Sequence, residues 1–262
     1  SYDTDLTDEQ WRLIRRHIPR AKHGGRPRET NMRRVVDAIM YVVTHGCKWR
    51  GLPKDFRRGE RFTAILPNCK RGRLRRIHYD LYSKVRKAAG RDEQPSLLVI
   101  DSQSVKTGKC ASAETRGYDG GKRVKGRKRF IATDSLGLLV DVSMTTANRH
   151  DTKGGKKVLD KYRKRVKKSR VEKVVADKGF RGNLLTGSVK SAFKAVLEIG
   201  QNHTTAKTGF VPAKNRWVVE RGFAWLGDYR RLTIDYERKL AHSCAMVRLA
   251  FIRLMLRRLV PV

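Results

Sequence analysis

A short apolar run that ends on an aspartate constrains the fold of this chain most. Residues 97–100 read Leu-Leu-Val-Ile, with Pro95 shortly before them and Asp101 directly after them. The run is too short for a helix, and an unbroken apolar series is typical of a strand buried on both faces of a sheet. In open α/β sheets, functional groups lie at the carboxyl ends of central strands. We therefore predict a central strand that ends at Asp101, with this carboxylate in the functional site.

A second strand-like run also ends on a carboxylate. Residues 171–176 are rich in valine and lead into Asp177. If the two strands lie side by side and parallel, Asp101 and Asp177 meet at one edge of the sheet, and like charges that close are costly without a cation. Carboxylate oxygens suit Mg²⁺ or Mn²⁺. The pair therefore predicts a divalent metal site.

The charge of the chain points to a polyanionic partner. Among 262 residues there are 61 Lys and Arg against 25 Asp and Glu, a formal net charge of +36. Such an excess indicates nucleic acid binding, with an affinity that falls steeply as salt rises. A solubilising surface would mix both signs. A histone-like packaging protein would share the charge, but it would not need the paired carboxylates.

Several features of the sequence indicate the cellular compartment of the protein. The cysteines are scattered without a Cys-x-x-Cys pair, so we expect neither a zinc site nor a disulfide framework, and a reduced cytosolic compartment fits. The polar amino terminus predicts no signal peptide. The most apolar segment, 245–260, contains four arginines, so it predicts an amphipathic helix rather than a membrane span.

Helical patterns precede the first strand. Residues 6–19 begin with a capping box formed by Thr7 and Gln10, residues 31–44 have one apolar side and end at Gly46, and residues 62–89 are helical with breaks at Pro67 and Gly72. Short basic helices in this position indicate a helical DNA-binding unit. For any single helix, a packing layer with a solvated basic face is a nearly equal alternative.

The order of elements after residue 101 is that of a mixed α/β protein. We expect a basic, glycine-rich loop over 107–127, a hairpin over 130–144, a helix over 151–166, and, after the second carboxylate strand, a helix and a further strand over 193–199. The basic loop could meet phosphates, although a solvated charge run is the usual reading of such a segment.

A third carboxylate lies in a segment that is apolar on nearly every side. Residues 214–226 predict a helix buried against the sheet, with Glu220 one turn after Arg216. As a surface pair, these two residues would contribute only about 0.2–0.5 kcal/mol. Burying an unpaired carboxylate costs several kcal/mol, so we interpret Glu220 as a metal ligand.

Other acidic and aromatic residues have simpler explanations. Turn or cap roles suffice for Asp134, Asp141 and Asp151, and a capping or surface role suffices for His150. Core packing is the default for the tryptophans, although base stacking is an alternative for Trp49, Trp217 and Trp225.

Together these motifs resemble the DDE transposases of bacterial insertion sequences, with the insertion sequence 5 family closest. The resemblance covers almost the whole chain. In the catalytic half it rests on Val-Ile-Asp-Ser-Gln-Ser-Val-Lys and on segments 117–122, 126–129, 176–182 and 216–226. At the two ends it rests on 25–28, 38–43, 46–53, 229–232, 235–238 and 252–258.

The resemblance implies an RNase H-like mixed sheet flanked by helices over 93–262, preceded by a small all-helical DNA-binding domain over 1–92. Asp101, Asp177 and Glu220 would be the catalytic residues and would hold two Mg²⁺ or Mn²⁺ ions. The partners would be transposon-end inverted repeats and target DNA, bound by a homodimer in the bacterial nucleoid. Residues predicted to contact nucleic acid are Arg26, Arg28, Lys48, Arg50, Lys106, Lys122, Lys125, Arg127, Lys128, Arg216 and Arg221.

Two other classes stay open at this point. One is a nuclease or resolvase on the same fold, which cuts DNA without joining it. The other is a catalytically inactive, transposase-derived DNA-binding protein that needs no metal. Strand-transfer products distinguish the first from a transposase, and an effect of metal on thermal stability tests the second.

Overall fold

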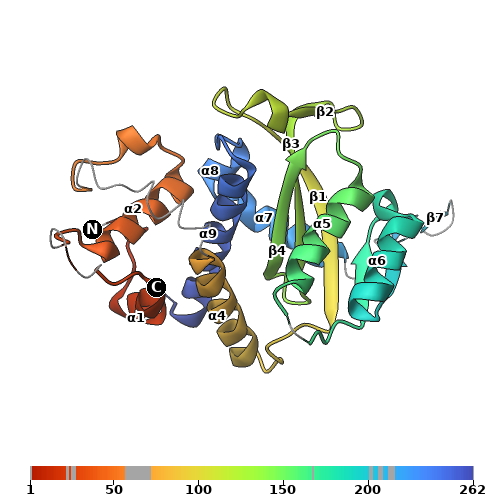
Figure 1. Cartoon of the computed structure of the whole chain (residues 1–262), viewed down its shortest axis with the longest axis horizontal. Coiled ribbons are helices and arrows are strands. Elements are labelled where there is room, and N and C mark those ends of the chain that lie inside the picture. Colours follow the sequence, from red (N-terminus) through yellow and green to blue (C-terminus); the bar gives the residue numbers. More distant parts are fainter. Residues whose placement is uncertain are drawn as a thin grey trace.

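A computed structural model describes residues 2–21, 24, 28–56, 72–166, 168–200, 203–205, 209–211 and 216–261, with backbone only for 203–205, 209–211 and 216. Its centre is a mixed sheet in the order β4-β3-β1-β5-β6, with the short β2 paired to the start of β3 (Figure 1). The strands are β1 (Leu97–Lys106), β2 (Gly117–Asp119), β3 (Val124–Thr133), β4 (Leu139–Thr146), β5 (Lys173–Ala176) and β6 (Val196–Ile199). The predicted α/β class is therefore confirmed.

The first strand is longer than its apolar run. Asp101 was predicted to end it, but β1 continues to Lys106, because β3 pairs with it antiparallel from Val99 opposite Thr133 to Lys106 opposite Gly126. For the same reason, residues 124–127 belong to β3 and not to the predicted basic loop. The pairing of two distant segments extends both strands beyond their local sequence signals.

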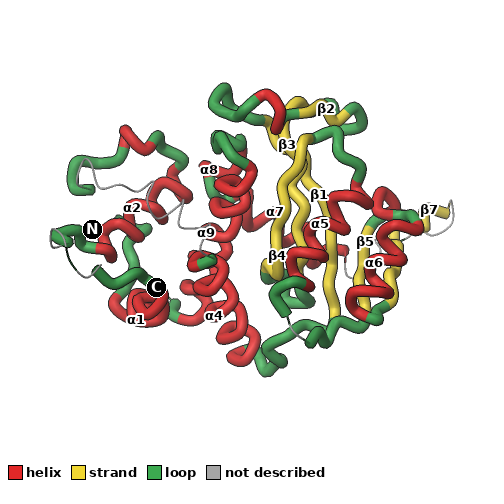
Figure 2. Tube along the Cα trace, viewed as in Figure 1, coloured by secondary structure: helices red, strands yellow, loops and turns green. Residues whose placement is uncertain are grey.

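Helices cover both faces of the sheet (Figure 2). Helices α5 (Asp151–Arg163) and α6 (Asn183–Phe193) pack on one face, and α7 (Arg216–Gly227) packs on β1 and β3. A Cβ at Gly154 of α5 would meet the Phe130 ring, whereas one at Gly222 of α7 would lie near Ile131. Consecutive residues of a strand point to opposite faces. Hence α5 and α7 lie on opposite faces of the sheet.

The remaining helices form a layer beside β4. They are α1 (Asp8–Ile14), α2 (Met32–His45), α4 (Arg73–Ala88), α8 (Arg230–Thr233) and α9 (Leu240–Leu259). Helix α9 packs on β4, α2 and α4, so the two ends of the chain meet in one layer (Figure 1). The Thr7–Gln10 capping box and the left-handed Gly46 after α2 are both present, as predicted. The domain boundary at residue 92 stays a prediction.

Short elements complete the described chain. Strands β7 (His203–Thr205) and β8 (Gly209–Val211) form a separate hairpin, and 3₁₀ turns cover Arg15–His17, Trp49–Gly51, Ala113–Thr115 and Lys178–Phe180. The helical pattern predicted before Gly72 falls largely on residues 57–71, outside the described residues. Across the described ranges, Cys47, Cys110 and Cys244 are free thiols, and no helix has the length and apolar character to span a membrane.

The close contact of α5 with β3 predicts that Gly154→Ala destabilises the fold. An added Cβ would lie 2.1 Å from Cζ of Phe130, a fully buried ring that also packs edge-on against Phe180. Overpacking of this kind costs about 1–3 kcal/mol. As a matched control, Gly187→Ala in α6 meets nothing within 4 Å and should raise the free energy of unfolding by about 0.5–1 kcal/mol. Urea unfolding followed by circular dichroism measures both, and equal stabilities would contradict this packing.

A buried histidine predicts a loss of stability in mild acid. Burial, followed by the charges of Arg165 and Arg248, lowers the pKa of His78 from 6.5 to about 3. The unfolded chain therefore binds the proton more readily, so the contribution to stability is full above pH 6.5 and is lost as pH falls toward 3. Between pH 7 and pH 5 the loss should be about 2 kcal/mol. Urea unfolding at several pH values should show a flatter profile for His78→Gln, and identical profiles would refute the assignment.

Candidate active site

The two strands that lead to the predicted aspartates lie next to each other in the sheet. Strands β1 and β5 pair in parallel, with Leu97 beside Lys173 and Val99 beside Val175. Continued by two residues, the same register places Asp177 beside Asp101. Neighbouring strands are about 4.8 Å apart, so we expect the two carboxylates to be close neighbours. The parallel pairing predicted from the sequence is confirmed, and the meeting of the two carboxylates stays a prediction.

Backbone amides hold both carboxylates in place. Oδ1 of Asp101 accepts a hydrogen bond from the Ser102 amide at 2.7 Å. Oδ1 of Asp177 accepts one from the Gly179 amide at 3.0 Å and so caps the 3₁₀ turn that follows β5. Both aspartates are partly exposed, so they are accessible to a substrate.

Helix α7 covers the face of the sheet to which Asp101 belongs. Asp101 pairs with Ile131, and Ile131 lies 3.6 Å from the position of a Cβ at Gly222 in α7. Paired residues of adjacent strands share a face. The helix that carries Glu220 therefore packs on the same face as Asp101.

The environment of Glu220 differs from the prediction. Helix α7 was expected to be apolar on nearly every side and buried against the sheet, but Glu220 is exposed and Trp217, one turn earlier, is 55% exposed. Only the side with Val218, Val219 and Leu226 is buried. The inference that burial forces Glu220 to bind a cation is therefore wrong, because one side of the helix faces solvent. Its assignment as a ligand now depends on its position relative to Asp101.

The carboxylates do not form a ready three-ligand metal site. Within the described ranges, no group of three or more His, Cys, Asp or Glu side chains is arranged to hold an ion. The oxygen chemistry of the Asp101 and Asp177 pair does fit a divalent cation, and the repulsion between the two favours one. The pair is thus the part of the predicted ligand set that the fold brings together.

A fourth carboxylate, Asp151, lies near Asp177. It begins α5, accepts hydrogen bonds from the Ser102 hydroxyl at 3.0 Å and the Lys128 ammonium at 3.3 Å, and lies 2.9 Å from the position of a Cβ at Gly179. The same Cβ position is 3.3 Å from Asp177 Oδ1. A turn or cap role was considered sufficient for Asp151. Its place next to Ser102 depends on tertiary packing, and no local signal reveals it.

Lys128 is the counter-ion of two carboxylates, Asp151 and Asp119. Its ammonium lies 3.3 Å from Asp151 and 3.4 Å from Asp119, and the side chain is largely buried. Although burial raises the pKa of Asp119, hydrogen bonds from the Ser104 hydroxyl and the Lys122 amide outweigh it, so the pKa is lowered. Lys128 is therefore an internal counter-ion, and the predicted phosphate contact does not fit its place.

Arg127, another predicted phosphate contact, is fully enclosed. Its side chain has no exposed surface, and the strand places it on the face opposite Lys128. Its guanidinium donates to Asp235 Oδ2 at 3.1 Å, Ser243 Oγ at 2.9 Å, Thr115 Oγ1 at 2.6 Å and the carbonyls of Glu237 and Arg238. A saturated, buried guanidinium cannot reach DNA, so this prediction is corrected to a structural role.

The other predicted nucleic-acid contacts differ in accessibility. Those exposed at the surface are Arg28, Lys48, Arg50, Lys106, Lys122 and Lys125. Arg26 lies outside the described residues, as does the side chain of Arg216. The guanidinium of Arg221 lies 4.7 Å from the Trp217 ring and 5.0 Å from the Trp225 ring, and it donates to the Leu136 carbonyl at 2.9 Å. Arg221 therefore fixes α7 to the hairpin turn, while the exposed Trp217 departs from the expected core packing.

Comparison with known proteins yields two family matches. Residues 92–255, which include all three predicted catalytic carboxylates, match the family described as "Transposase DDE domain". Residues 6–78 match the family described as "Putative transposase of IS4/5 family". The "Uncharacterized protein y4sN" of Sinorhizobium fredii (strain NBRC 101917 / NGR234) is 31% identical over 115 residues, which are 44% of this chain and 86% of that protein.

The burial of Arg127 predicts that Arg127→Met destabilises the protein. The change leaves Asp235 without its ion-pair partner in the interior, which should cost about 3–5 kcal/mol. The neighbouring Lys125 is exposed, so Lys125→Met should change stability by less than about 0.5 kcal/mol. Urea unfolding measures both variants. A stable Arg127→Met protein with a selective loss of DNA affinity would contradict the structural role and support the predicted phosphate contact.

Proposed function

Since this chain belongs to the DDE transposases of the IS4/IS5 type, with an RNase H-like fold, we propose that it cleaves DNA at the terminal inverted repeats of its element and joins the 3′ ends to target DNA. The observation that supports this proposal is the parallel pairing of β1 with β5, whose register, if continued by two residues, would bring Asp177 beside Asp101. Members of the family are enzymes that act on DNA, which agrees with the net charge of +36.

The proposed chemistry is a divalent-metal-dependent phosphoryl transfer. Asp101 and Asp177 would share one Mg²⁺ or Mn²⁺ ion, and Glu220 would hold a second. When bound, the ions would activate the attacking water or 3′-hydroxyl and stabilise the leaving oxygen. All three carboxylates lie in the part of the chain that matches the DDE domain.

The chain's own groups prepare this site. The amides of Ser102 and Gly179 each hold one aspartate oxygen, so the carboxylates are oriented before any substrate arrives. Lys128 offsets the charge of Asp151, which limits the repulsion around Asp177. Exposed cations at the same end of the sheet, Lys106, Lys122 and Lys125, would bind the phosphates of the DNA strand.

The proposal also covers the subunit assembly and the DNA that it binds. Two DNA ends must be joined together, so a homodimer on paired ends is the expected assembly, working on DNA in the nucleoid. The exposed Arg28, Lys48 and Arg50 of the helical region would contribute to recognition of the inverted repeats. A monomer on a synapsed pair of ends would contradict the dimer.

A strand-transfer assay tests the function. Purified protein is incubated with labelled inverted-repeat ends and a plasmid target, with Mg²⁺ or with EDTA. Joined products should appear only with metal, and Asp101→Asn and Glu220→Gln should reduce them to background while end binding is unchanged. Asp92→Asn is the matched control, because this exposed carboxylate pairs with Arg170 outside the site.

The other outcomes separate the alternatives. Cutting without joining identifies a nuclease on the same fold. Tight binding with neither activity identifies an inactive DNA-binding protein. Loss of end binding in Glu220→Gln would make Glu220 a structural residue rather than a ligand.

A further inference from the structure

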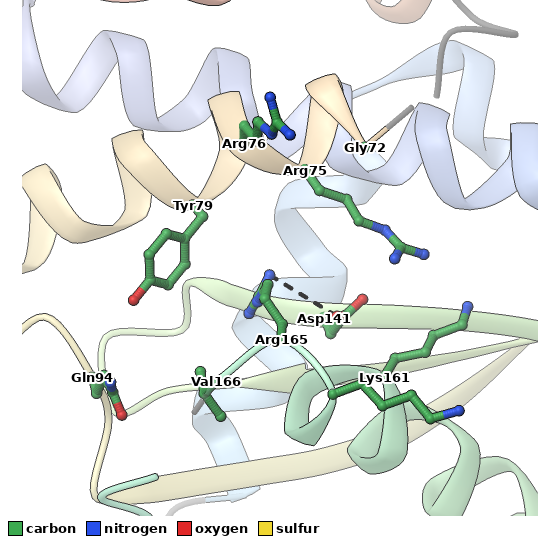
Figure 3. A pocket seen from close by; sticks show the side chains of 10 residues that line it. Gly72, Arg75, Arg76, Tyr79, Gln94, Asp141, Lys161, Arg165 and Val166 are labelled. Atoms are coloured by element: carbon green, nitrogen blue, oxygen red, sulfur yellow. Dashed lines mark ion pairs between the residues drawn. The ribbon is translucent and has the colours of Figure 1, made fainter. Parts of the chain in front are cut away.

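A basic cavity lies beside β4, away from the paired aspartates. It has a volume of about 470 Å³ and opens between α4, the segment before β1 and the end of α5. Figure 3 shows Arg75 and Tyr79 extending from α4 toward the strand that carries Asp141, with Arg165 in the space between. Asp141 is on β4, and Asp177 follows β5, three strands away in the sheet. At about 4.8 Å per strand, β4 and β5 are roughly 14 Å apart within the sheet. Asp141 pairs with Ala132 and so belongs to the face that α5 covers, opposite to the face of Asp101.

The charges that line the cavity are unbalanced. Five cations, Arg75, Arg76, Lys161, Lys164 and Arg165, face a single carboxylate, Asp141. That carboxylate is already neutralised, because it is buried and paired with Arg248, a sixth cation. Cations gathered around one neutralised acid repel one another unless an anion joins them.

Arg165, on the wall of the cavity, has few partners of its own. Its Nη2 donates to the Val140 carbonyl at 2.9 Å, and its Nη1 is 4.0 Å from Asp141 Oδ2. Its Nε and Nη1 have no hydrogen-bond partner among the described residues. The Tyr79 and Tyr162 rings, 5.1 Å and 5.3 Å from the guanidinium, hold it in place. Nε and Nη1 are also shielded from solvent, so Arg165 adds an incompletely compensated positive charge beside the cavity.

The rim of the cavity is accessible. Arg75, Arg76 and Lys164 are exposed, and none of them forms an ion pair with the described part of the chain. Lys161 differs from these three residues, because burial lowers the pKa of its ammonium group. The free cations are therefore at the mouth, where a polyanion can reach them.

We propose that this cavity binds a phosphate group of the DNA backbone, as a second DNA contact separate from the carboxylate site. The assignment rests on the proposed function for the identity of the polymer, while its chemistry rests on the five cations, the cavity and Arg165. The volume exceeds that of one phosphate and suits a nucleotide unit. Free phosphate has the same chemistry, so the test separates the two sources.

The test compares two double variants of the full chain. Arg75→Gln with Lys164→Gln removes two charges at the cavity mouth. Lys190→Gln with Lys194→Gln removes two charges from exposed positions at the end of α6, outside the cavity. Fluorescence anisotropy with a labelled 30-base-pair duplex gives the affinity at several salt concentrations, and circular dichroism checks that both variants fold.

The cavity variant should reduce the magnitude of the slope of log K against log salt by about 0.9 for each phosphate that it no longer binds. It should also reduce the DNA affinity at 0.1 M salt by about tenfold per phosphate. The α6 variant should keep the wild-type slope. Equal slopes for both variants would overturn the proposal. Calorimetry with inorganic phosphate tests the second source. If phosphate binding disappears in the cavity variant while its salt slope for DNA is unchanged, the cavity binds free phosphate and the proposed DNA contact is overturned.

The comparison of salt slopes between the two double variants does not depend on catalysis. If the wild type fails to join DNA ends, the proposed reaction falls, but the comparison of salt slopes keeps its meaning. If the strand-transfer assay succeeds and the slopes are equal, only the second contact is refuted.

Discussion

The parallel pairing of β1 with β5 is the constraint on which the rest of the site depends. It aligns two strands whose register, if continued, would make their carboxylates neighbours, and a shift of one residue would send one of them to the opposite face. The register is secured from both sides, since β3 pairs with β1 along eight residue positions and β6 pairs with β5 along four. Like charges are thus held together by backbone hydrogen bonds and core packing, and the repulsion between them favours a cation at this place.

Part of the basic character of the chain serves the interior of the fold. Along β3, Arg127 and Arg129 point to one face and Lys128 points to the other, and all three are buried. Arg127 binds Asp235, Lys128 binds Asp119 and Asp151, and Arg129 donates to Gln103 at 3.0 Å. Burial lowers the pKa of Arg129 to about 10, which reflects the cost of keeping this charge inside. A run of basic residues can therefore be structural even in a DNA-binding protein.

Local sequence signals were sufficient for the parts of the fold that depend on near neighbours. The Thr7 capping box, the Gly46 helix end, the hairpin around Gly137 and the two aspartates after apolar runs all follow from patterns a few residues long. The extension of β1 to Lys106 depends on β3 and has no such pattern. The exposure of Glu220 depends on which side of α7 meets the sheet, and the placement of Asp151 beside Ser102 depends on how α5 docks. Contacts of this kind are decided between distant segments, so periodicity alone could not reveal them.

Helix α4 connects the two regions that the proposals assign to DNA. It packs on α9, its end leads through residues 89–96 into β1, and its Arg75 and Tyr79 face the basic cavity. Asp141 pairs with Ala132 on the face that α5 covers, whereas Asp101 pairs with Ile131 on the face that α7 covers. DNA that reaches both places would pass around an edge of the sheet and would be fixed at two points on one rigid scaffold. Two fixed points define the direction of a DNA backbone, whereas one leaves it free to pivot. The second contact would thus orient the substrate for an in-line displacement and would also add affinity, because positioning accounts for much of the acceleration in phosphoryl transfer.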